Sequence, residues 1–502
     1  MRQTSYEKFK NYFEIGTQES NLKKLAIRGG IATGIGQVSQ QALKLFFTVI
    51  IARLLSPNDY GLIAMITTVT GFVILFKDLG LSMATVQRET ISHYEVSNLF
   101  WLNILFSITV WLIILAMAPF IAWFYNKPEL LVLTLALSTG FVLSGLSMQH
   151  QAILKRKMMF SKLIVIEIGA QTLSVITGVI LAASGAGVWA LVFMELTRSA
   201  SNVIITWCYC TWRPSLPQRN ISVKSMLKFG ANYTGANILS YFNYQLPFVL
   251  IGKFWGADSL GIFDKAYQLM LYPVRQLNQP FGSVAIPTLS RLQNDPVKYK
   301  KYYESAILLL SYISMPPIAY LVVMAKSIIL FLLGARWDGA SELFAVLGLY
   351  GIFIPVLNTS MWLFVSTGKS KEMMCWQLFD GIATIMAVVI GISFGTKGVV
   401  VCWVSIKLIL MFPSLLYAAR GTPVTLKGIC VICLVPFLSV LISSILLFFF
   451  KNHFLQEVTV SMGILISVVF YSLIFTILDC ILSRSFYPFK KLVELYRIIK
   501  AQ

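Results

Sequence analysis

The chain has little charge for its length. Only 12% of its 502 residues are charged, whereas about 25% is usual for a soluble domain. Hydrophobic residues make up 57%, and apolar runs of around twenty residues with almost no charge recur along the chain. Runs of this kind form membrane-spanning helices. The composition therefore excludes a soluble protein and predicts an all-α polytopic membrane protein.

The sequence also lacks the signatures of several catalytic and energy-coupling sites. Its three histidines, His93, His150 and His453, are scattered near loop edges, so neither a zinc site nor a Ser–His pair is supported. Gly368-Lys369-Ser370 matches the end of a phosphate-binding loop, but that pattern needs a glycine where this chain has Leu363. We therefore expect no enzyme, no metal, no cofactor and no ATPase engine.

Acidic residues are outnumbered by basic ones, 21 to 41, and the excess has a topological pattern. Most of the Lys and Arg residues fall in every second loop, together with the two ends of the chain. This is the positive-inside pattern, and it places both termini in the cytoplasm. The net charge of +20 is thus a topology signal with affinity for anionic headgroups, and we expect no nucleic-acid partner.

Short polar turns divide the hydrophobic sequence into about 14 expected transmembrane helices. No cleavable apolar segment precedes the first, so the first span itself is expected to direct insertion. The expected spans are residues 29–54, 62–86, 97–123, 130–151, 162–183, 187–210, 226–251, 259–288, 303–327, 340–366, 373–394, 398–419, 428–450 and 458–482.

An internal repeat appears when the sequence is shifted by 200 residues. Gly61 then meets Gly261, and the turn Ser56-Pro57-Asn58-Asp59 meets Gly256-Ala257-Asp258-Ser259, a short turn plus helix N-cap in both halves. The polar positions recur too: Gln37, Gln41 and Lys44 meet Asn237, Tyr241 and Tyr244. The shift predicts two pseudo-symmetric six-helix lobes, related by an axis along the membrane normal, plus two C-terminal helices.

The expected domain organisation follows from these spans and the repeat. It comprises a cytoplasmic N-terminal arm (1–28), an N-lobe (29–211), a cytoplasmic linker (212–225), a C-lobe (226–420), the last two spans (427–482) and a cytoplasmic amphipathic tail (483–502).

The most informative stretch is the first span. Thr33, Gln37, Gln41, Lys44 and Thr48 fall on one face of an otherwise apolar helix. A lysine at mid-bilayer costs about 2.5–3.5 kcal/mol even on a lenient insertion scale, so it must face protein or water. The stripe predicts one wall of a wet cavity, and the alternative is an interhelical packing face.

The second span and its counterpart, the eighth, add further polar groups. Lys77 and Asp78 interrupt the second span, or lie at a membrane interface. The eighth carries one polar face, made up of Asp264, Gln268, Arg275, Asn278 and Ser283. Prolines at 273, 280 and 287 also punctuate it, and they are either hinges for a rocking transporter or static kinks.

Three stretches resemble a known transporter family. They are Ile51 to Gly61, with its R-x-L-x-P-x-x-Y-G element, Lys77 to Leu81, and Tyr267 to Arg291. On these residues the chain resembles the Wzx-type polysaccharide flippases of the multidrug/oligosaccharidyl-lipid/polysaccharide (MOP) exporter superfamily, whose multidrug branch is MATE. It is most similar to the colanic-acid/lipopolysaccharide exporter group.

The resemblance implies a function, partners and a location. The expected role is to flip undecaprenyl-diphosphate-linked oligosaccharide to the outer leaflet of the bacterial inner membrane by alternating access, for exopolysaccharide or lipopolysaccharide synthesis. A diphosphate needs cations in a low-dielectric cleft. The expected substrate cavity contains the cations Lys44, Lys77 and Arg275, with Arg198 and Lys407 ranked behind them. It also contains Gln268 and four residues expected to bond sugar hydroxyls: Gln37, Gln41, Asn237 and Tyr241.

Without an ATPase motif, the expected driving force is an ion gradient, the membrane potential or a substrate gradient. H+ or Na+ is an expected partner in the first case, and the polysaccharide polymerase machinery is a further expected partner. Intramembrane acids are the candidates for coupling: Asp264, Glu167, Glu195, Asp380 and Asp78. Each has an alternative role as an internal partner for a nearby cation.

Two other functions remain open at this stage. A cation-coupled multidrug exporter of the same fold predicts a smaller and more acidic pocket than the basic one here. A membrane-embedded polysaccharide polymerase or ligase would need a long outer loop bearing acid, Arg or His groups, which the sequence lacks.

Overall fold

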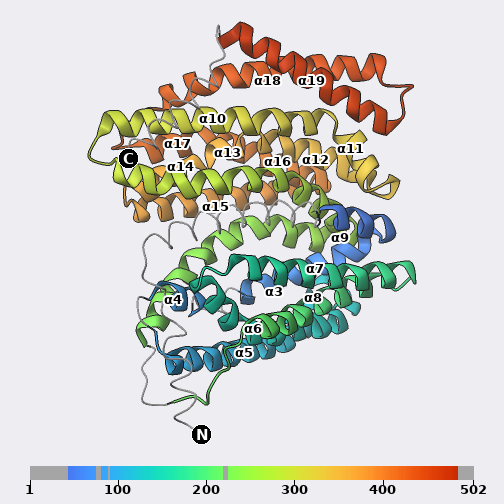
Figure 1. Ribbon diagram of the computed structural model, residues 1–502. Helices are drawn as coiled ribbons and strands as arrows, with labels where there is room; N and C mark the ends of the chain where they lie inside the picture. The colour runs from blue at the N-terminus through green and yellow to red at the C-terminus, as the bar shows by residue number, and fades with distance from the viewer. Residues whose placement is uncertain (1–42, 44, 75–80, 89–90, 219–223, 484–502) are drawn as a thin grey trace. The chain divides into compact units, whose positions relative to one another are not determined.

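A computed structural model describes residues 43, 45–74, 81–88, 91–218 and 224–483 of the protein (Figure 1). All regular structure in these ranges is helical. The helices are α3 (Pro57–Ile74), α4 (Leu81–Gln87), α5 (His93–Tyr125), α6 (Glu129–Arg156), α7 (Phe160–Ala183), α8 (Val188–Tyr209), α9 (Lys224–Arg291), α10 (Pro296–Val323), α11 (Ala325–Leu332), the 3₁₀ turn η1 (Ala335–Trp337), α12 (Asp338–Gly351), α13 (Ile354–Leu357), α14 (Thr359–Ser366), α15 (Ser370–Ile392), α16 (Gly395–Ile409), α17 (Met411–Ala419), α18 (Leu426–Phe454) and α19 (Val460–Ser483).

Within the described ranges, 11 helices are long and apolar enough to cross a membrane. A twelfth candidate is the pair Leu45–Leu54 and Pro57–Val73, which is bent by 120°. The predicted all-α multi-pass membrane fold is confirmed. The number fourteen stays a prediction, because part of the first two expected spans lies outside the described residues.

The start of α3 is capped as the sequence predicts. Ser56 Oγ accepts from the backbone N–H of Asp59 at 3.3 Å, and Asp59 Oδ2 accepts from the backbone N–H of Ser56 at 2.9 Å. This reciprocal pair satisfies donors at the helix N-terminus that have no intrahelical partner. The cap fixes the sharp turn between the first two apolar segments.

The corresponding turn in the second half lies within α9. Gly256 breaks the helical backbone there with φ 79° and ψ −173°. Only glycine adopts such a conformation without strain. The expected seventh and eighth spans therefore meet at Gly256, 200 residues after the cap residue Ser56.

The two turns contact each other in a reciprocal way. A Cβ added to Gly61 would lie 2.8 Å from the Cα atom of Ala257, and one added to Gly261 would lie 2.8 Å from the carbonyl carbon of Pro57. Positions 57 and 61 thus contact 257 and 261 crosswise, which is what a repeat with a 200-residue offset predicts. We call this four-residue contact the glycine crossing.

The chain divides into two compact units, Met1–Gly261 and Ile262–Gln502. In the first, α5 packs along α6, α7 along α8, and α6 against α8 (Figure 1). Its described core includes Leu99, Phe100, Ile153 and the indole of Trp212, all nearly or fully inaccessible to solvent. Trp212 belongs to the expected interlobe linker, so the start of this linker packs into the first unit.

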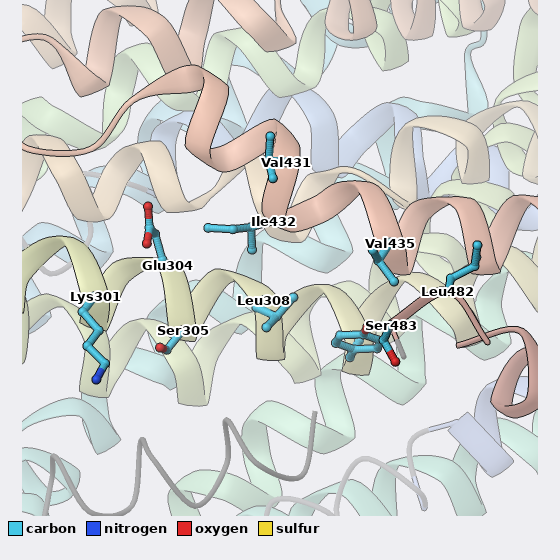
Figure 2. Close-up of a pocket in the computed structure, with 10 residues that line it drawn as sticks. Lys301, Glu304, Ser305, Leu308, Val431, Ile432, Val435, Leu482 and Ser483 are labelled. Atoms are coloured by element: carbon cyan, nitrogen blue, oxygen red, sulfur yellow. The ribbon is translucent and has the colours of Figure 1, made fainter. Parts of the chain in front are cut away.

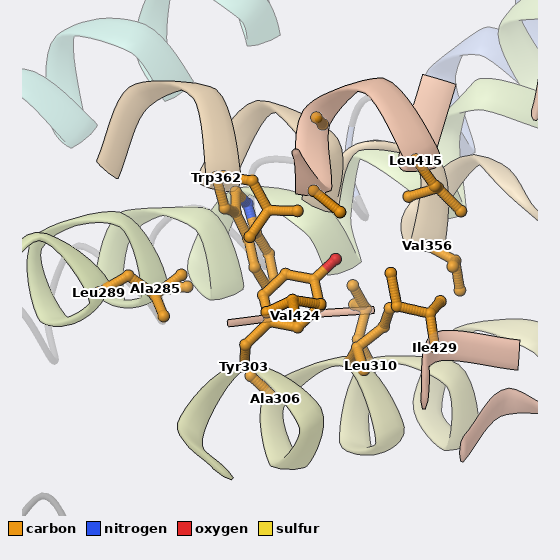
Figure 3. Close-up of a cluster of buried hydrophobic side chains, with 14 of the residues drawn as sticks. Ala285, Leu289, Tyr303, Ala306, Leu310, Val356, Trp362, Leu415, Val424 and Ile429 are labelled. Atoms are coloured by element: carbon orange, nitrogen blue, oxygen red, sulfur yellow. The ribbon is translucent and has the colours of Figure 1, made fainter. Parts of the chain in front are cut away.

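In the second unit, α10 packs against α12 and α18, and α18 packs against α19. Figure 3 shows the central cluster, in which Tyr303 and Leu310 of α10 lie among Val356, Trp362 and Leu415. The fully buried Tyr303 hydroxyl is 2.7 Å from Thr359 Oγ1. The second unit thus has a well-packed core with its central polar group satisfied.

The glycine crossing predicts a sharp sensitivity to small side chains. We expect Gly61→Ala and Gly261→Ala each to destabilise the protein by about 1–3 kcal/mol or more, because backbone atoms, not flexible side chains, meet the added methyl group. The measurement is the melting temperature of the purified protein in detergent.

The matched control is Gly463→Ala in α19. No atom lies within 4 Å of a Cβ added there, so this change should be neutral or slightly stabilising. Equal melting temperatures for all three variants would contradict the reciprocal contact.

Candidate functional site

Several of the predicted cavity residues lie outside the part of the chain that the structure describes. They are Gln37, Gln41, Lys44 and Lys77, and the ion-coupling candidate Asp78 lies outside it as well. The backbone of Asn237 lies in α9, but its side chain is not described. Thr48, the last residue of the polar stripe, is described and half-buried. The first-span wall of the cavity therefore stays a prediction.

Tyr241 links α9 to α3 within the first unit. Its hydroxyl donates to the backbone carbonyl of Thr68 at 2.7 Å, and its ring lies 6.4 Å from that of Phe72. This hydrogen bond joins the two helices within the first unit.

A charged group lies near the middle of α8. Arg198 Nε donates to Glu195 Oε2 at 2.9 Å, and its Nη2 donates to Oε1 at 2.6 Å. The two side chains are 43% and 44% exposed, so at this depth they must line water or the bundle interior. Glu167 of α7 lies within electrostatic range of Arg198. The α7–α8 pair therefore brings one arginine together with two glutamates.

Asp264 and Gln268 of α9 form a second polar group with Lys265. Gln268 Nε2 donates to both carboxylate oxygens of Asp264, at 2.9 and 2.8 Å. Lys265 Nζ is 3.7 Å from Asp264 Oδ2, and both charged residues are buried. The sequence predicts that Asp264 and Gln268 lie on one helical face. It does not predict the contact with Lys265, because neighbouring residues of a helix do not face each other.

Arg275 lies near the middle of the second half of α9 and is exposed. Among the described residues no carboxylate pairs with it. Almost one turn further on, both polar atoms of the Asn278 side chain are buried without a hydrogen-bond partner. Arg275 is thus the described cavity candidate whose positive charge is open to an external anion.

Lys407 of α16 and Asp380 of α15 form a buried ion pair. Lys407 Nζ is 2.5 Å from Asp380 Oδ2, and the side chains are only 8% and 22% exposed. The two helices pack side by side, which brings together residues 27 positions apart. The sequence analysis assigns Lys407 to substrate binding and Asp380 to ion coupling. In the structure the two side chains form an ion pair with each other.

Two of the three histidines lie close to the same aromatic side chain, that of Trp212. Trp212 Nε1 donates to His93 Nδ1 at 3.0 Å, and the ring of His150 lies 5.0 Å from that of Trp212 and 4.5 Å from that of Trp207. His150 is fully buried. These contacts between distant segments form an aromatic anchor for the linker rather than a ligand site.

Further hydrogen bonds extend this anchor along the linker. Asn98 and Gln218 exchange two bonds of 2.8 Å, and the Trp101 indole donates to the carbonyl of Ser215 at 2.8 Å. The backbone N–H of Ser215 donates to Ser97 Oγ at 3.1 Å. Residues 212–218 are therefore fixed to α5.

A family model for polysaccharide biosynthesis proteins matches residues 50–342, more than half of the chain, and the chain therefore belongs to this family. The lipopolysaccharide biosynthesis protein WzxC of Escherichia coli (strain K12) is 25% identical over 377 residues, which cover 74% of this chain and 76% of WzxC. The succinoglycan biosynthesis transport protein ExoT of Rhizobium meliloti (strain 1021) is 22% identical over 462 residues, covering 91% of this chain and 93% of ExoT.

Among solved structures, the lipid II flippase MurJ in an inward closed conformation is similar to this chain with a TM-score of 0.71. The likeness covers 90% of this chain and 99% of MurJ at 16% identity, and it shows the same fold. The family membership and the fold predicted from the sequence are both confirmed.

The Lys407–Asp380 pair allows a test of structural against functional roles. We expect Lys407→Met alone to destabilise the protein by about 3–5 kcal/mol, because it leaves a buried carboxylate unpaired. The double change Lys407→Met with Asp380→Asn should recover most of that loss. The measurement is the melting temperature of each purified variant.

The double variant also reports on function through polymer export. If the double variant is stable and still exports polymer, neither residue is needed for substrate binding or ion coupling. A double variant no more stable than the single one would contradict the pairing.

Proposed function

We propose that the protein flips undecaprenyl-diphosphate-linked oligosaccharide repeat units from the inner to the outer leaflet of the bacterial cytoplasmic membrane. The family match supports this most directly, because it extends over 58% of the chain, residues 50–342 of 502. WzxC and ExoT, by their names, act in lipopolysaccharide biosynthesis and in succinoglycan transport, and MurJ flips lipid II. The family and fold are those of transporters rather than enzymes.

Arg275 supplies the chemistry that the substrate requires. A diphosphate brought below the headgroup region loses hydration, and a guanidinium replaces it best because its planar fork bonds two phosphate oxygens at once. The cations Arg198, Lys265 and Lys407 already have carboxylate partners within the described residues. In the proposal, Arg275 therefore receives the diphosphate, together with Lys44 and Lys77.

The proposed mechanism is alternating access between the N-lobe (29–211) and the C-lobe (226–420), with both termini cytoplasmic. The glycine crossing supports a pivot between equivalent turns, since two backbones in direct contact can rock without a side chain to displace. The half-exposed Glu195–Arg198 pair suits a cavity wall that offers both acceptors and donors to sugar hydroxyls.

Ion coupling is the part of the proposal with most alternatives. Glu195 and Asp380 each hold a cation tightly, so protonating either one costs an ion pair. Asp264 is held by a neutral amide and by a lysine at 3.7 Å. We rank Asp264 first for H+ or Na+, ahead of Glu167, Glu195, Asp380 and Asp78.

The deciding experiment is a deletion strain. Loss of a flippase should make lipid-linked repeat units accumulate with their sugars accessible only from the cytoplasmic side. Unchanged repeat units combined with new drug sensitivity would favour a multidrug exporter. Outward-facing repeat units that are not polymerised would favour a polymerase or ligase.

Arg275 is the described residue whose loss should matter most. We expect Arg275→Ala to reduce polymer export at least tenfold without changing protein abundance in the membrane. Arg275→Lys should recover part of the export, because it keeps the charge but not the fork. The control is Arg336→Ala, which changes an exposed arginine within the 3₁₀ turn η1. Full export by Arg275→Ala would contradict the role.

Lys44 provides a second, independent test on the first span. We expect Lys44→Ala to abolish polymer export while the protein still inserts, because the diphosphate loses a mid-bilayer cation. The measurement is surface polymer in the complemented deletion strain, normalised to the amount of protein in the membrane. Wild-type export would remove Lys44 from the mechanism.

A further inference from the structure

Two polar regions of the molecule differ in how far their hydrogen-bonding groups are used. A pocket of about 290 Å³ lies between α10 and α18 in the second unit (Figure 2). Of the residues that line it, Tyr312 donates to Asp479 of α19 at 2.7 Å, and Glu304 lies 3.9 Å from Lys300. In the first unit, by contrast, α6, α7 and α8 carry accessible polar side chains whose hydrogen-bonding atoms are not all used.

The polar residues of α8 lie on the side of the helix that faces away from lipid. Glu195, Arg198 and Asn202 follow one another at intervals of three and four residues, so they share one side. Phe193 and Ile204, which are 46% and 63% exposed, lie nine residues from Asn202 and from Glu195 respectively. Nine residues are two and a half turns of a helix, so these exposed apolar side chains point the opposite way, toward lipid. The polar side of α8 therefore faces the interior of the unit.

Helix α7 has the same arrangement. Glu167 and Gln171 lie one turn apart, and neither is buried. Ile176 and Ile180, which are 51% and 62% exposed, each lie nine residues further along and so on the opposite side. Gln171 makes no hydrogen bond within the described part of the chain. An amide in this position, turned away from lipid and without a partner in the protein, is available to a ligand.

The packing of the helices brings these polar sides next to each other. Helix α8 packs against both α6 and α7, which contact each other much less (Figure 1). Ser174 Oγ of α7 donates to the backbone carbonyl of Met194 of α8 at 2.7 Å. Because the two helices are antiparallel, this contact places Gln171 level with Arg198.

Gln151 of α6 adds a second amide beside α8. Its Nε2 atom donates to Asn202 Oδ1 at 2.7 Å. The other two polar atoms of this pair, Gln151 Oε1 and Asn202 Nδ2, have no partner among the described residues, and neither is buried. The pair therefore presents one acceptor and one N–H donor group next to each other. We call the following residues the amide–carboxylate face: Gln151, Glu167, Gln171, Glu195, Arg198 and Asn202.

The chemistry of this face matches sugar rings better than a diphosphate. Carboxylates accept hydrogen bonds, a guanidinium donates them and an amide does both, whereas each sugar hydroxyl can donate and accept. The face has two carboxylates and one guanidinium, and Glu195 already holds that guanidinium through two bonds. The excess negative charge repels a diphosphate. Uncharged rings with several neighbouring hydroxyls have no such conflict.

We propose that the amide–carboxylate face binds the sugar part of the transported lipid, through uncharged rings that carry hydroxyl or acetamido groups. The inference rests on the proposed flippase function and adds sugar-binding residues to it. Asn202 Nδ2 donates to one sugar oxygen and Gln151 Oε1 accepts from a neighbouring hydroxyl. Gln171 and Glu167 bind the adjoining hydroxyls from the side of α7.

The test compares two lipids that differ only in the sugar. The full-length chain in lipid nanodiscs is titrated with undecaprenyl diphosphate and with the lipid-linked repeat unit extracted from membranes of the deletion strain. We expect the repeat unit to bind about tenfold more tightly, because its hydroxyls form hydrogen bonds that the other lipid lacks. Equal affinities, or no binding of the repeat unit, overturn the inference.

Asn202→Asp separates the sugar contact from the contact between helices. The aspartate keeps an oxygen that accepts from Gln151 but removes the free N–H groups. We expect the affinity for the repeat unit to fall about three- to tenfold, with the affinity for undecaprenyl diphosphate and the melting temperature unchanged. The matched control is Asn452→Asp at the exposed end of α18, which should change neither affinity.

Gln171→Met provides a second variant that does not alter charge. It removes an amide without a partner in the described part of the chain, so the fold should be unaffected and the affinity for the repeat unit should again fall. An unchanged affinity for the repeat unit in both variants overturns the inference. An equal loss for both lipids indicates a structural role and overturns it as well.

A cationic drug is the competing occupant, because the face has one more carboxylate than guanidinium. If tetraphenylphosphonium displaces the repeat unit, and Glu167→Gln abolishes this displacement, the face binds a cation and the inference is overturned. Polymer export in the complemented deletion strain is measured separately and decides the flippase function. Normal export without a preference for the sugar-bearing lipid would therefore refute the sugar site alone.

Discussion

The structure depends above all on the cost of charge inside a bilayer. An ionised side chain at that depth must be paired, wetted or turned toward an interface. Glu195 with Arg198, Asp264 with Lys265, and Asp380 with Lys407 meet this condition by pairing. Pairing lowers the cost of placing these charges at that depth, and each carboxylate offsets the positive charge of its partner cation. Arg275, exposed at mid-helix, meets the condition only if it faces water or an anion, and this is why it stands out chemically.

Whether a contact could be predicted from the sequence depends on how far apart its residues lie along the chain. The cap at Ser56 and Asp59 and the break at Gly256 depend on residues within one helical turn, and the sequence predicts both. The pair Glu195–Arg198 is equally local, and the sequence leaves it open as the alternative to ion coupling. The ion pair between Lys407 and Asp380 depends on two helices that lie side by side. The sequence therefore marks both residues as candidates for the site but does not predict that they pair. Lys44 and the rest of the first-span stripe stay predictions.

The linker is a second case in which contacts between distant segments could not be predicted from the sequence. Polar composition and basic charge correctly place residues 212–218 outside the helices, and suggest a simple connection. In the structure Trp212 enters the core of the first unit, and Asn98, Ser97 and Trp101 bind the next residues. Such long-range contacts leave no local pattern. They make the start of the linker part of the first unit, so movement between the proposed lobes has to arise after residue 218.

The glycine crossing has a consequence for the origin of the chain. Because positions 57 and 61 meet 257 and 261 crosswise, the contact is self-complementary, as in an interface between two identical subunits. Two half-length chains inserted in the same orientation would form this contact once, with its two equivalent halves related by a two-fold axis. Fusion of such a dimer preserves the contact, and from then on each glycine is constrained by a residue of the other half. The two halves can diverge almost everywhere else while this small region remains alike.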